Sequence, residues 1–227
     1  MNFLLTNDDG IDAMGLNLLA EVCADLGDVT VVAPSQEQSG VGHRVTTRGA
    51  LALDTRAERR HALAGTPADC TRVGLTALGA QVDWVLSGLN HGGNLGVDIH
   101  MSGTVAGARE GAILGYQALA ISQVLSAKFP PDPVVIRRMT ERVIRQLTAR
   151  PLASGQLYNV NLPFAPESDE PEVVLTGPDP SPHDVHFTAV DGGFQYAGVF
   201  LNRPRQPGLD IEVVFSGKIA VSILTVA

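Results

Sequence analysis

The chain has 227 residues, of which 44% are hydrophobic and 5% are aromatic, and its formal net charge is −8. This length suits one α/β domain with a substantial core, and the low aromatic content favours helices packed closely on a sheet. The acidic charge argues against binding of duplex nucleic acid, because such a surface repels phosphate groups. Phosphate chemistry would therefore need local positive charge, from a metal ion or a helix N-terminus.

The sequence contains no pattern typical of export or membrane insertion. An acidic pair interrupts the N-terminal residues before any hydrophobic region has signal-peptide length, and no later apolar run approaches about 18 residues. Cys23 and Cys70 are the two cysteines, and we expect both to be buried free thiols. These features predict a cytoplasmic protein that does not bind membranes.

The first elements along the chain predict a parallel sheet. Residues 2–6 and 29–33 have the pattern of short buried strands, and residues 15–26 carry apolar side chains at helical spacing. A strand, a helix and a second strand within about 33 residues have the length of a βαβ crossover, which builds parallel sheets. Further along, the patterns predict strands over 44–53, 82–87 and 117–122 and helices over 66–78, 104–114 and 133–149.

The C-terminal third of the chain has a different character. A strand is expected over 158–162, six prolines follow within 163–184, and alternating strands are expected over 194–200 and 211–226. We therefore predict a single domain over 1–227, with a Rossmann-like three-layer core over 1–156, a mostly parallel sheet, and a β-rich C-terminal extension over 157–227. Such an extension leaves unpaired strand edges that a partner subunit can cover, so we expect a homodimer or homotetramer.

An acidic pair follows the first predicted strand. In an open parallel sheet, ligands bind beyond the carboxyl ends of the strands, which is where Asp8 and Asp9 are expected. Adjacent carboxylates repel each other unless a cation holds them, and hard oxygen donors suit Mg²⁺ or Mn²⁺. An Asp-Asp-Gly turn without a ligand is the alternative for this pair taken alone.

Two further loops are expected at the same edge. The loop after the second strand contains Ser39 and two glycines, and the loop after the strand over 82–87 contains Asn90 and Asn94, whose amide oxygens are neutral donors. Three oxygen-rich loops at one edge favour a metal site over a ligand-free turn.

The residues at the start of the helix over 104–114 could bind a phosphoryl oxygen. Ser102, Gly103 and Thr104 offer hydroxyls and free backbone N–H groups at the positive end of the helix dipole. Capping of the helix is the alternative for these hydroxyls taken alone. In company with the metal loops, phosphate binding is the favoured interpretation.

The remaining polar residues give weaker indications. His91 and His100 could touch substrate or be solvated loop residues, and Glu110 could be structural. His183 and His186 have the spacing of a soft-metal pair, but no cysteine accompanies them, so a zinc site is not expected.

Four sequence blocks together resemble the SurE (stationary-phase survival protein) family. They are TNDDGIDAMGL, VVAPSQEQSGVGHRVT, GTPADC and SGLNHGGNLGVDIHMSGTVAGAREGAILG, and they occur in the order typical of that family. The resemblance implies a Rossmann-like core, a divalent cation, 5′- and 3′-nucleotidase activity on nucleoside monophosphates, and exopolyphosphatase activity in some members. It also implies dimers or tetramers formed by exchange of a C-terminal segment.

The resemblance also implies roles for individual residues. By motif position, the metal ligands would be Asp8, Asp9, Ser39 and Asn90. The phosphoryl group would face Asn94, Ser102 and Thr104, and the substrate-binding set comprises Ser39, Gly40, Asn94, Ser102, Gly103 and Thr104. Asp8, Asp9 and Asn94 are the candidate catalytic residues. The attacking water would be oriented by Asp8 or Asp9 or polarised by the metal alone, and an aspartyl phosphate is a further alternative.

Two other classes of protein remain as alternatives. A receiver-like regulatory module also carries an acidic pair after its first strand, but it needs an acceptor Asp at the end of a central strand, and none follows 29–33 or 82–87 directly. A non-catalytic nucleotide-binding protein would bind a monophosphate with metal and release no phosphate.

Overall fold

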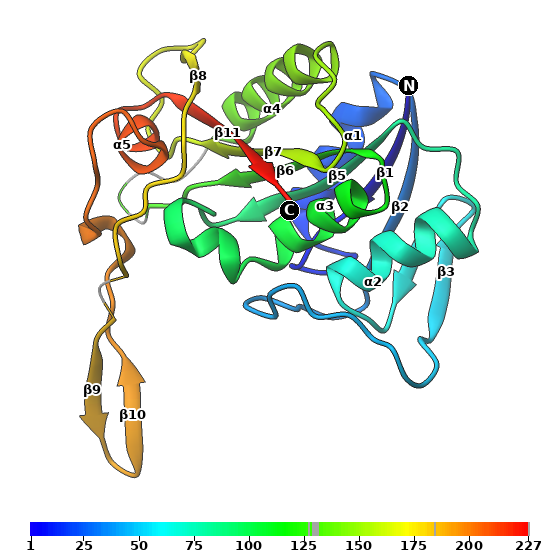
Figure 1. Ribbon diagram of the computed structural model, residues 1–227, viewed down its shortest axis with the longest axis horizontal. Helices are drawn as coiled ribbons and strands as arrows, with labels where there is room; N and C mark the ends of the chain where they lie inside the picture. Colours follow the sequence, from blue (N-terminus) through cyan, green and yellow to red (C-terminus); the bar gives the residue numbers. More distant parts are fainter. Residues whose placement is uncertain (127, 129–131, 184, 227) are drawn as a thin grey trace.

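The computed structural model describes residues 1–126, 128, 132–183 and 185–226. Within these residues, nine strands form one sheet in the order β3-β4-β2-β1-β5-β6-β7-β11-β8, and two more form a separate hairpin (Figure 1). The strands of the large sheet are β1 (Asn2–Thr6), β2 (Asp28–Pro34), β3 (Leu53–Ala57), β4 (Arg60–Leu63), β5 (Trp84–His91), β6 (Gln117–Gln123), β7 (Gln156–Leu162), β8 (Val173–Leu175) and β11 (Ile219–Thr225).

The centre of this sheet is parallel. Strands β4, β2, β1, β5, β6 and β7 pair in parallel with their neighbours, whereas β3 and β11 run antiparallel to β4 and β7. The chain first adds strands on the β2 side of β1 and later on the β5 side, so the strand order reverses at β1. Loops diverge at such a point and leave a crevice at the carboxyl ends of the strands. The predicted α/β fold with a mostly parallel sheet is confirmed.

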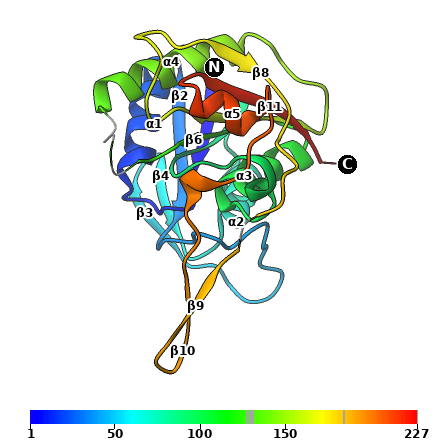
Figure 2. The ribbon, with the colours of Figure 1, turned by 90° about the vertical axis from the view of Figure 1, so that its left-hand side faces the viewer.

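Two pairs of helices cover the sheet. Helices α1 (Met14–Ala24) and α4 (Pro133–Thr148) pack on one face, and α2 (Pro67–Arg72) and α3 (Gly103–Ile113) pack on the other (Figures 1 and 2). Helix α3 lies directly on the strands, because a Cβ at Gly107 or Gly111 would come within 2.8 Å of Ser87 or Val85. This close approach holds the N-terminus of α3 against the carboxyl ends of β1 and β5.

Three sequence-based element predictions were wrong in detail. Residues 44–52 form no strand, because Gly49 has a φ of +84° and Thr46 bonds to Asp69 instead of a neighbouring strand. The helix predicted over 66–78 is α2 followed by the π-helical segment η1 (Val73–Ala77). The strand predicted over 211–226 is helix α5 (Asp210–Phe215) followed by β11, and Gly217, with a φ of +88°, separates them.

Much of the C-terminal segment belongs to the large sheet. Strands β7, β11 and β8 extend it, and only the hairpin of β9 (Phe187–Val190) and β10 (Gly193–Tyr196) projects away from the body (Figures 1 and 2). The 3-10 segment η3 (Phe200–Asn202) follows the hairpin. The described residues between 157 and 226 are therefore partly core and partly projection.

Two further expectations concern the thiols and the helices. Cys23 and Cys70 are free and buried, as predicted, and burial raises the pKa of the Cys23 thiol to about 12. Among the described helices, none combines the length and apolar character needed to span a bilayer.

Candidate active site

Three loops meet at the carboxyl edge of the sheet, as the sequence predicted. Strand β1 lies between β2 and β5, so the loops that follow these strands leave the same edge. The backbone N–H of Gln38 donates to the carbonyl of Asp8 at 2.7 Å, and the N–H of His91 donates to a carboxylate oxygen of Asp9 at 3.4 Å. The loops after β2 and β5 therefore both contact the acidic pair.

The N-terminus of α3 lies against Asp8. The Thr104 hydroxyl donates a short hydrogen bond to Asp8 Oδ1, and Gly103 packs on the same carboxylate. Ser102 caps the helix, because its hydroxyl accepts from the N–H of Val105 at 2.9 Å. The helix dipole is thus directed at the carboxylate of the first loop.

Burial raises the pKa values of both carboxyl groups of the acidic pair. It raises the pKa of the Asp8 carboxyl from 3.8 to about 6; the Thr104 hydrogen bond opposes this rise and the Asp9 charge adds to it. Burial also raises the pKa of Asp9, against the opposing hydrogen bond from the N–H of His91. Two carboxylates with raised pKa values at one strand end are the expected signature of a site that a cation would stabilise.

The donor chemistry of this edge fits a hard divalent cation. The described residues contain no cluster of three or more His, Cys, Asp or Glu side chains placed for a metal, so a cation here would depend on Asp8 and Asp9 together with neutral oxygens. The Asn90 amide nitrogen donates to the Gly92 carbonyl at 2.8 Å, which leaves the amide oxygen as the end of the group that can ligate a metal. The Ser39 hydroxyl donates to Glu37 at 2.7 Å and lies on the loop that contacts Asp8.

Asn94 anchors the third loop to the sheet. Its backbone N–H donates to Asn161 at 2.8 Å, its side-chain nitrogen donates to Ser122 at 2.8 Å, and its carbonyl accepts from Asn159 and Asn161. This buried network ties the loop after β5 to β6 and β7. The expected contact of Asn94 with a phosphoryl group stays a prediction.

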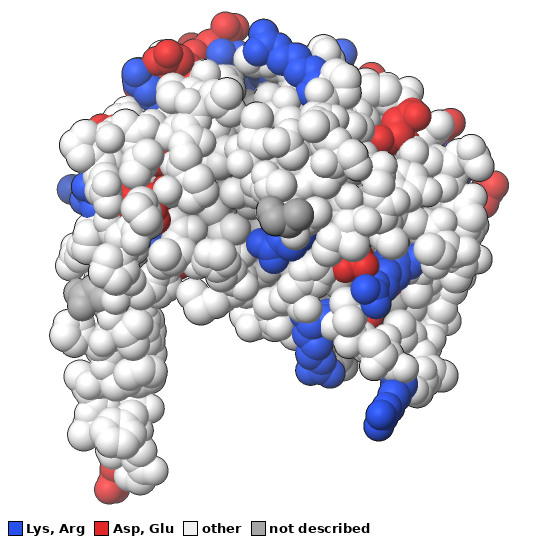
Figure 3. All heavy atoms as spheres, in the orientation of Figure 1, with Lys and Arg blue, Asp and Glu red and all other residues white. Residues whose placement is uncertain are grey.

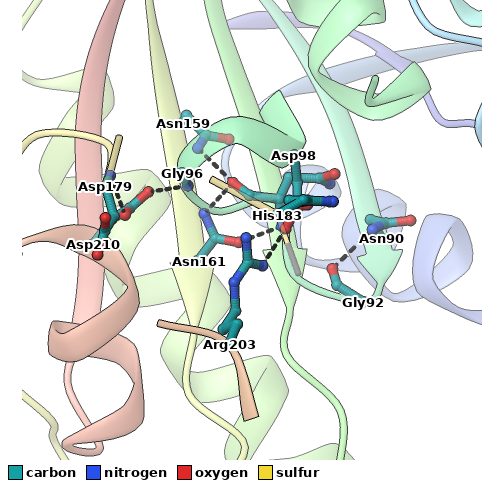
Figure 4. Close-up of polar contacts among 11 residues, drawn as sticks. Asn90, Gly92, Gly96, Asp98, Asn159, Asn161, Asp179, His183, Arg203 and Asp210 are labelled. Atoms are coloured by element: carbon teal, nitrogen blue, oxygen red, sulfur yellow. Dashed lines mark hydrogen bonds and ion pairs between the residues drawn. The ribbon is translucent and has the colours of Figure 1, made fainter. Parts of the chain in front are cut away.

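The third loop carries an ion-pair cluster that sequence reasoning missed. Asp98 accepts hydrogen bonds from both His183 and Arg203, which come from the two ends of the β9–β10 hairpin (Figure 4). His183, set aside as a zinc ligand from the sequence, is thus a partner of a carboxylate. His183 and Arg203 lie 85 and 105 positions after Asp98 in the sequence, and no local sequence pattern could have linked them.

Two buried carboxylates hold the same loop from the other side. Asp210 accepts from the N–H groups of Gly96 and Asp179, each at 2.8 Å (Figure 4). Asp179 in turn accepts from the N–H groups of Ser181 and Gln206. The loop that follows β5 is therefore fixed by the C-terminal segment.

Glu110 is a buried anchor behind the second loop. It is 1% exposed, and its two oxygens pair with His43 at 2.7 Å and Arg72 at 2.6 Å. His43 lies on the loop that carries Ser39, so this network connects that loop to α3. The structural role considered for Glu110 from the sequence agrees with these contacts.

Comparisons with known proteins agree with the fold and the loops. The profile of the family described as Survival protein SurE matches residues 3–179. A putative 5′-nucleotidase from Synechocystis sp. is 46% identical over 227 residues and covers 100% of both chains. The 5′-nucleotidase SurE of Paramagnetospirillum magneticum is 38% identical over 99% of this chain and 89% of its own.

Solved structures give the same result. The crystal structure of the SurE protein from Aquifex aeolicus superposes with a TM-score of 0.85 at 31% identity and covers 100% of this chain and 94% of that one. The sequence relatives and the fold therefore agree, and the resemblance noted in the sequence is confirmed. The chain belongs to the SurE family.

Proposed function

We propose that this protein is a divalent-metal-dependent phosphatase that hydrolyses nucleoside 5′- and 3′-monophosphates to nucleoside and phosphate. The observation that supports it most is the contact of Asp8 with the N-terminus of α3. A carboxylate that can hold a cation and a helix end that can hold a phosphoryl oxygen lie side by side there. Relatives of the SurE family are named 5′-nucleotidases, which supports nucleoside monophosphates as the substrate class.

Each group of this edge has a distinct part in the proposed reaction. Asp8, Asp9, Ser39 and Asn90 would hold Mg²⁺ or Mn²⁺, which when bound supplies Lewis-acid polarisation of the phosphoryl group. The free N–H groups at the start of α3, with Ser102, Gly103 and Thr104, would bind the equatorial oxygens and stabilise their charge. The acidic pair orients the attacking water.

A phosphate-release assay tests this proposal. Nucleoside 5′- and 3′-monophosphates and short polyphosphate would be assayed with Mg²⁺, with Mn²⁺ and with a chelator, and we expect metal-dependent release from the monophosphates. Asp8→Asn should lower turnover by several orders of magnitude, because metal binding and charge stabilisation are lost together. Asp12→Asn is the matched control, since Asp12 is an exposed carboxylate of the same loop.

Other outcomes would separate the alternatives. Tight binding of a monophosphate without phosphate release would show a non-catalytic nucleotide-binding protein. Phosphate retained on an aspartate of the protein, without turnover, would show a receiver-like module. Full turnover in the Asp8→Asn variant would show that this carboxylate is not part of the active site.

We also propose that the protein is a cytoplasmic homo-oligomer assembled through the β9–β10 hairpin. Large apolar side chains on and beside the hairpin are exposed, among them Phe187, Phe194 and Tyr196 at 59%, 77% and 55%. On the face shown in Figure 3, the projection has almost no charged groups except at its tip. Exposed apolar surface of this kind is typical of a protein interface.

A further inference from the structure

We propose that the cavity between Asp98 and the base of the β9–β10 hairpin binds the base of the substrate nucleotide, an uncharged aromatic ring. The cavity has a volume of about 160 Å³. It is lined by Asp98, Ser181, Pro182, His183, Tyr196, Gly198, Val199, Phe200, Arg203 and Pro204. This inference rests on the proposed function, because it assigns the part of the substrate that lies beyond the phosphoryl group.

The position of the cavity fits the leaving group of the proposed reaction. A Cβ at Gly93 would lie 3.2 Å from the Phe200 ring, so Phe200 packs on the loop that follows β5. Figure 4 shows Asp98 with His183 and Arg203, and Asp98 lies on the segment after β5 that also carries Gly92. The N–H of His91, two residues before Gly93, contacts Asp9, so we place the ester substituent of a phosphoryl group bound at the acidic pair on the side of this cavity.

The charges of the cavity fit a neutral ligand better than a second phosphate. Arg203 and the imidazole of His183 are the basic side chains among the described residues that line it, and both pair with Asp98. Arg203 is also placed over the Phe200 ring, 4.9 Å from its centroid. With these basic groups already paired, the cavity offers little attraction to a polyphosphate chain.

The aromatic side chains supply the stacking surface that a nucleobase needs. Phe200 is 38% exposed and Tyr196 is 55% exposed, although both line a cavity rather than a flat surface. The Tyr196 hydroxyl folds over Gly198, where a Cβ would come within 2.1 Å of it, so a larger residue at this position would displace the Tyr196 ring. Stacking on aromatic rings accepts any base, because every base has a π-face.

A kinetic comparison tests the proposal. Ribose 5-phosphate has the sugar and phosphate of a nucleoside 5′-monophosphate but no base, so the ratio of the two kcat/KM values measures recognition of the base. Phe200→Ala should lower this ratio roughly five- to hundredfold, as expected for loss of one stacking contact. Phe194→Ala is the matched control, because it removes, from the adjoining hairpin, an exposed ring that does not line the cavity.

Two results would overturn the proposal. One is an unchanged ratio in Phe200→Ala, and the other is an equal fall in Phe200→Ala and Phe194→Ala, which would assign the effect to assembly. Saturation-transfer NMR with adenosine, which carries no phosphate, provides a readout independent of turnover, and its signal should fall in Phe200→Ala at unchanged melting temperature. If the wild-type protein hydrolysed neither substrate yet bound adenosine in this way, the proposed function would fail and the base site would stand.

Discussion

A Cβ at Gly103 would lie 2.9 Å from both Cβ and Oδ2 of Asp8, so the first residue of α3 is in direct contact with the acidic pair. Gly103→Ala should therefore displace the Asp8 carboxylate while the helix remains formed, because alanine favours helix more than glycine does. We expect turnover of a nucleoside monophosphate to fall about 10- to 100-fold, the size that follows from a misplaced catalytic group. Steady-state kinetics measure this, with Ile113→Ala at the exposed end of the same helix as the control. Wild-type turnover in Gly103→Ala would show that the carboxylate tolerates movement and does not act in the reaction.

Asp69 should contribute stability that depends on pH. Burial alone would raise the pKa of this carboxyl, but hydrogen bonds from Thr46 and Thr66 outweigh it and lower the pKa below 3.8. A carboxyl with a lowered folded-state pKa stabilises the protein above its unfolded value of 3.8, and that stability is lost as pH falls through the folded pKa. Asp69→Asn should cost about 1 to 2 kcal/mol at pH 7.

Urea unfolding at pH 7 and pH 3 measures the effect of Asp69→Asn. The difference from wild type should shrink at the lower pH. Asp54→Asn, on the exposed strand β3, is the control that should change little at either pH. If Asp69→Asn lowered the free energy of unfolding equally at pH 7 and pH 3, the lowered pKa of Asp69 in the folded protein would be contradicted.

Arg72 should stabilise the fold through Glu110. Removing one partner leaves a buried carboxylate with His43 alone, so Arg72→Ala should lower the free energy of unfolding by about 1 to 3 kcal/mol. Arg56→Ala removes an exposed ion pair with Asp54 and should cost less than about 1 kcal/mol. Thermal or urea unfolding compares the two. Equal costs would show that the burial of Glu110 adds nothing to this pair.

The β9–β10 hairpin should control assembly. The double substitution Phe187→Ser and Phe194→Ser removes two exposed rings, so we expect a smaller particle in light scattering after gel filtration. Val134→Ser, at a 71% exposed position on α4, is the control for loss of a surface apolar group elsewhere. An unchanged mass in the double variant would place the interface away from the hairpin.

The core and the acidic edge were predictable because their signals are local. Buried runs such as residues 2–6 and 29–33, with a helix between them, dictate parallel pairing whatever the rest of the chain does. The position of Asp8 and Asp9 follows directly, since the carboxyl ends of neighbouring parallel strands share one edge. The closeness of Asp8 to Thr104 follows from the same crossover geometry.

The parts that escaped prediction depend on distant contacts. The stretch 211–215 has the alternation expected of a strand, yet α5 forms there: Asp210 at its start bonds to Gly96, 114 positions away, and Gly217, with a φ of +88°, separates the helix from β11. The residues 44–52 lose their strand because Thr46 bonds to Asp69. The Asp98 cluster joins the hairpin ends to the third loop, and no local propensity carries information of that kind.

The Gly96–Asp210 contact also has a consequence for synthesis of the protein. Strand β7 receives its antiparallel neighbour only from residues 219–225, and the loop after β5 receives its carboxylate only from α5. While the ribosome still holds these residues, the nascent chain has both proposed metal-binding aspartates, but its third loop lacks the contact of Gly96 with Asp210. Competence for the proposed reaction should therefore arise only after residues 210–225 have left the ribosome, and a product that stops before residue 210 should be inert even though every proposed metal ligand has been translated.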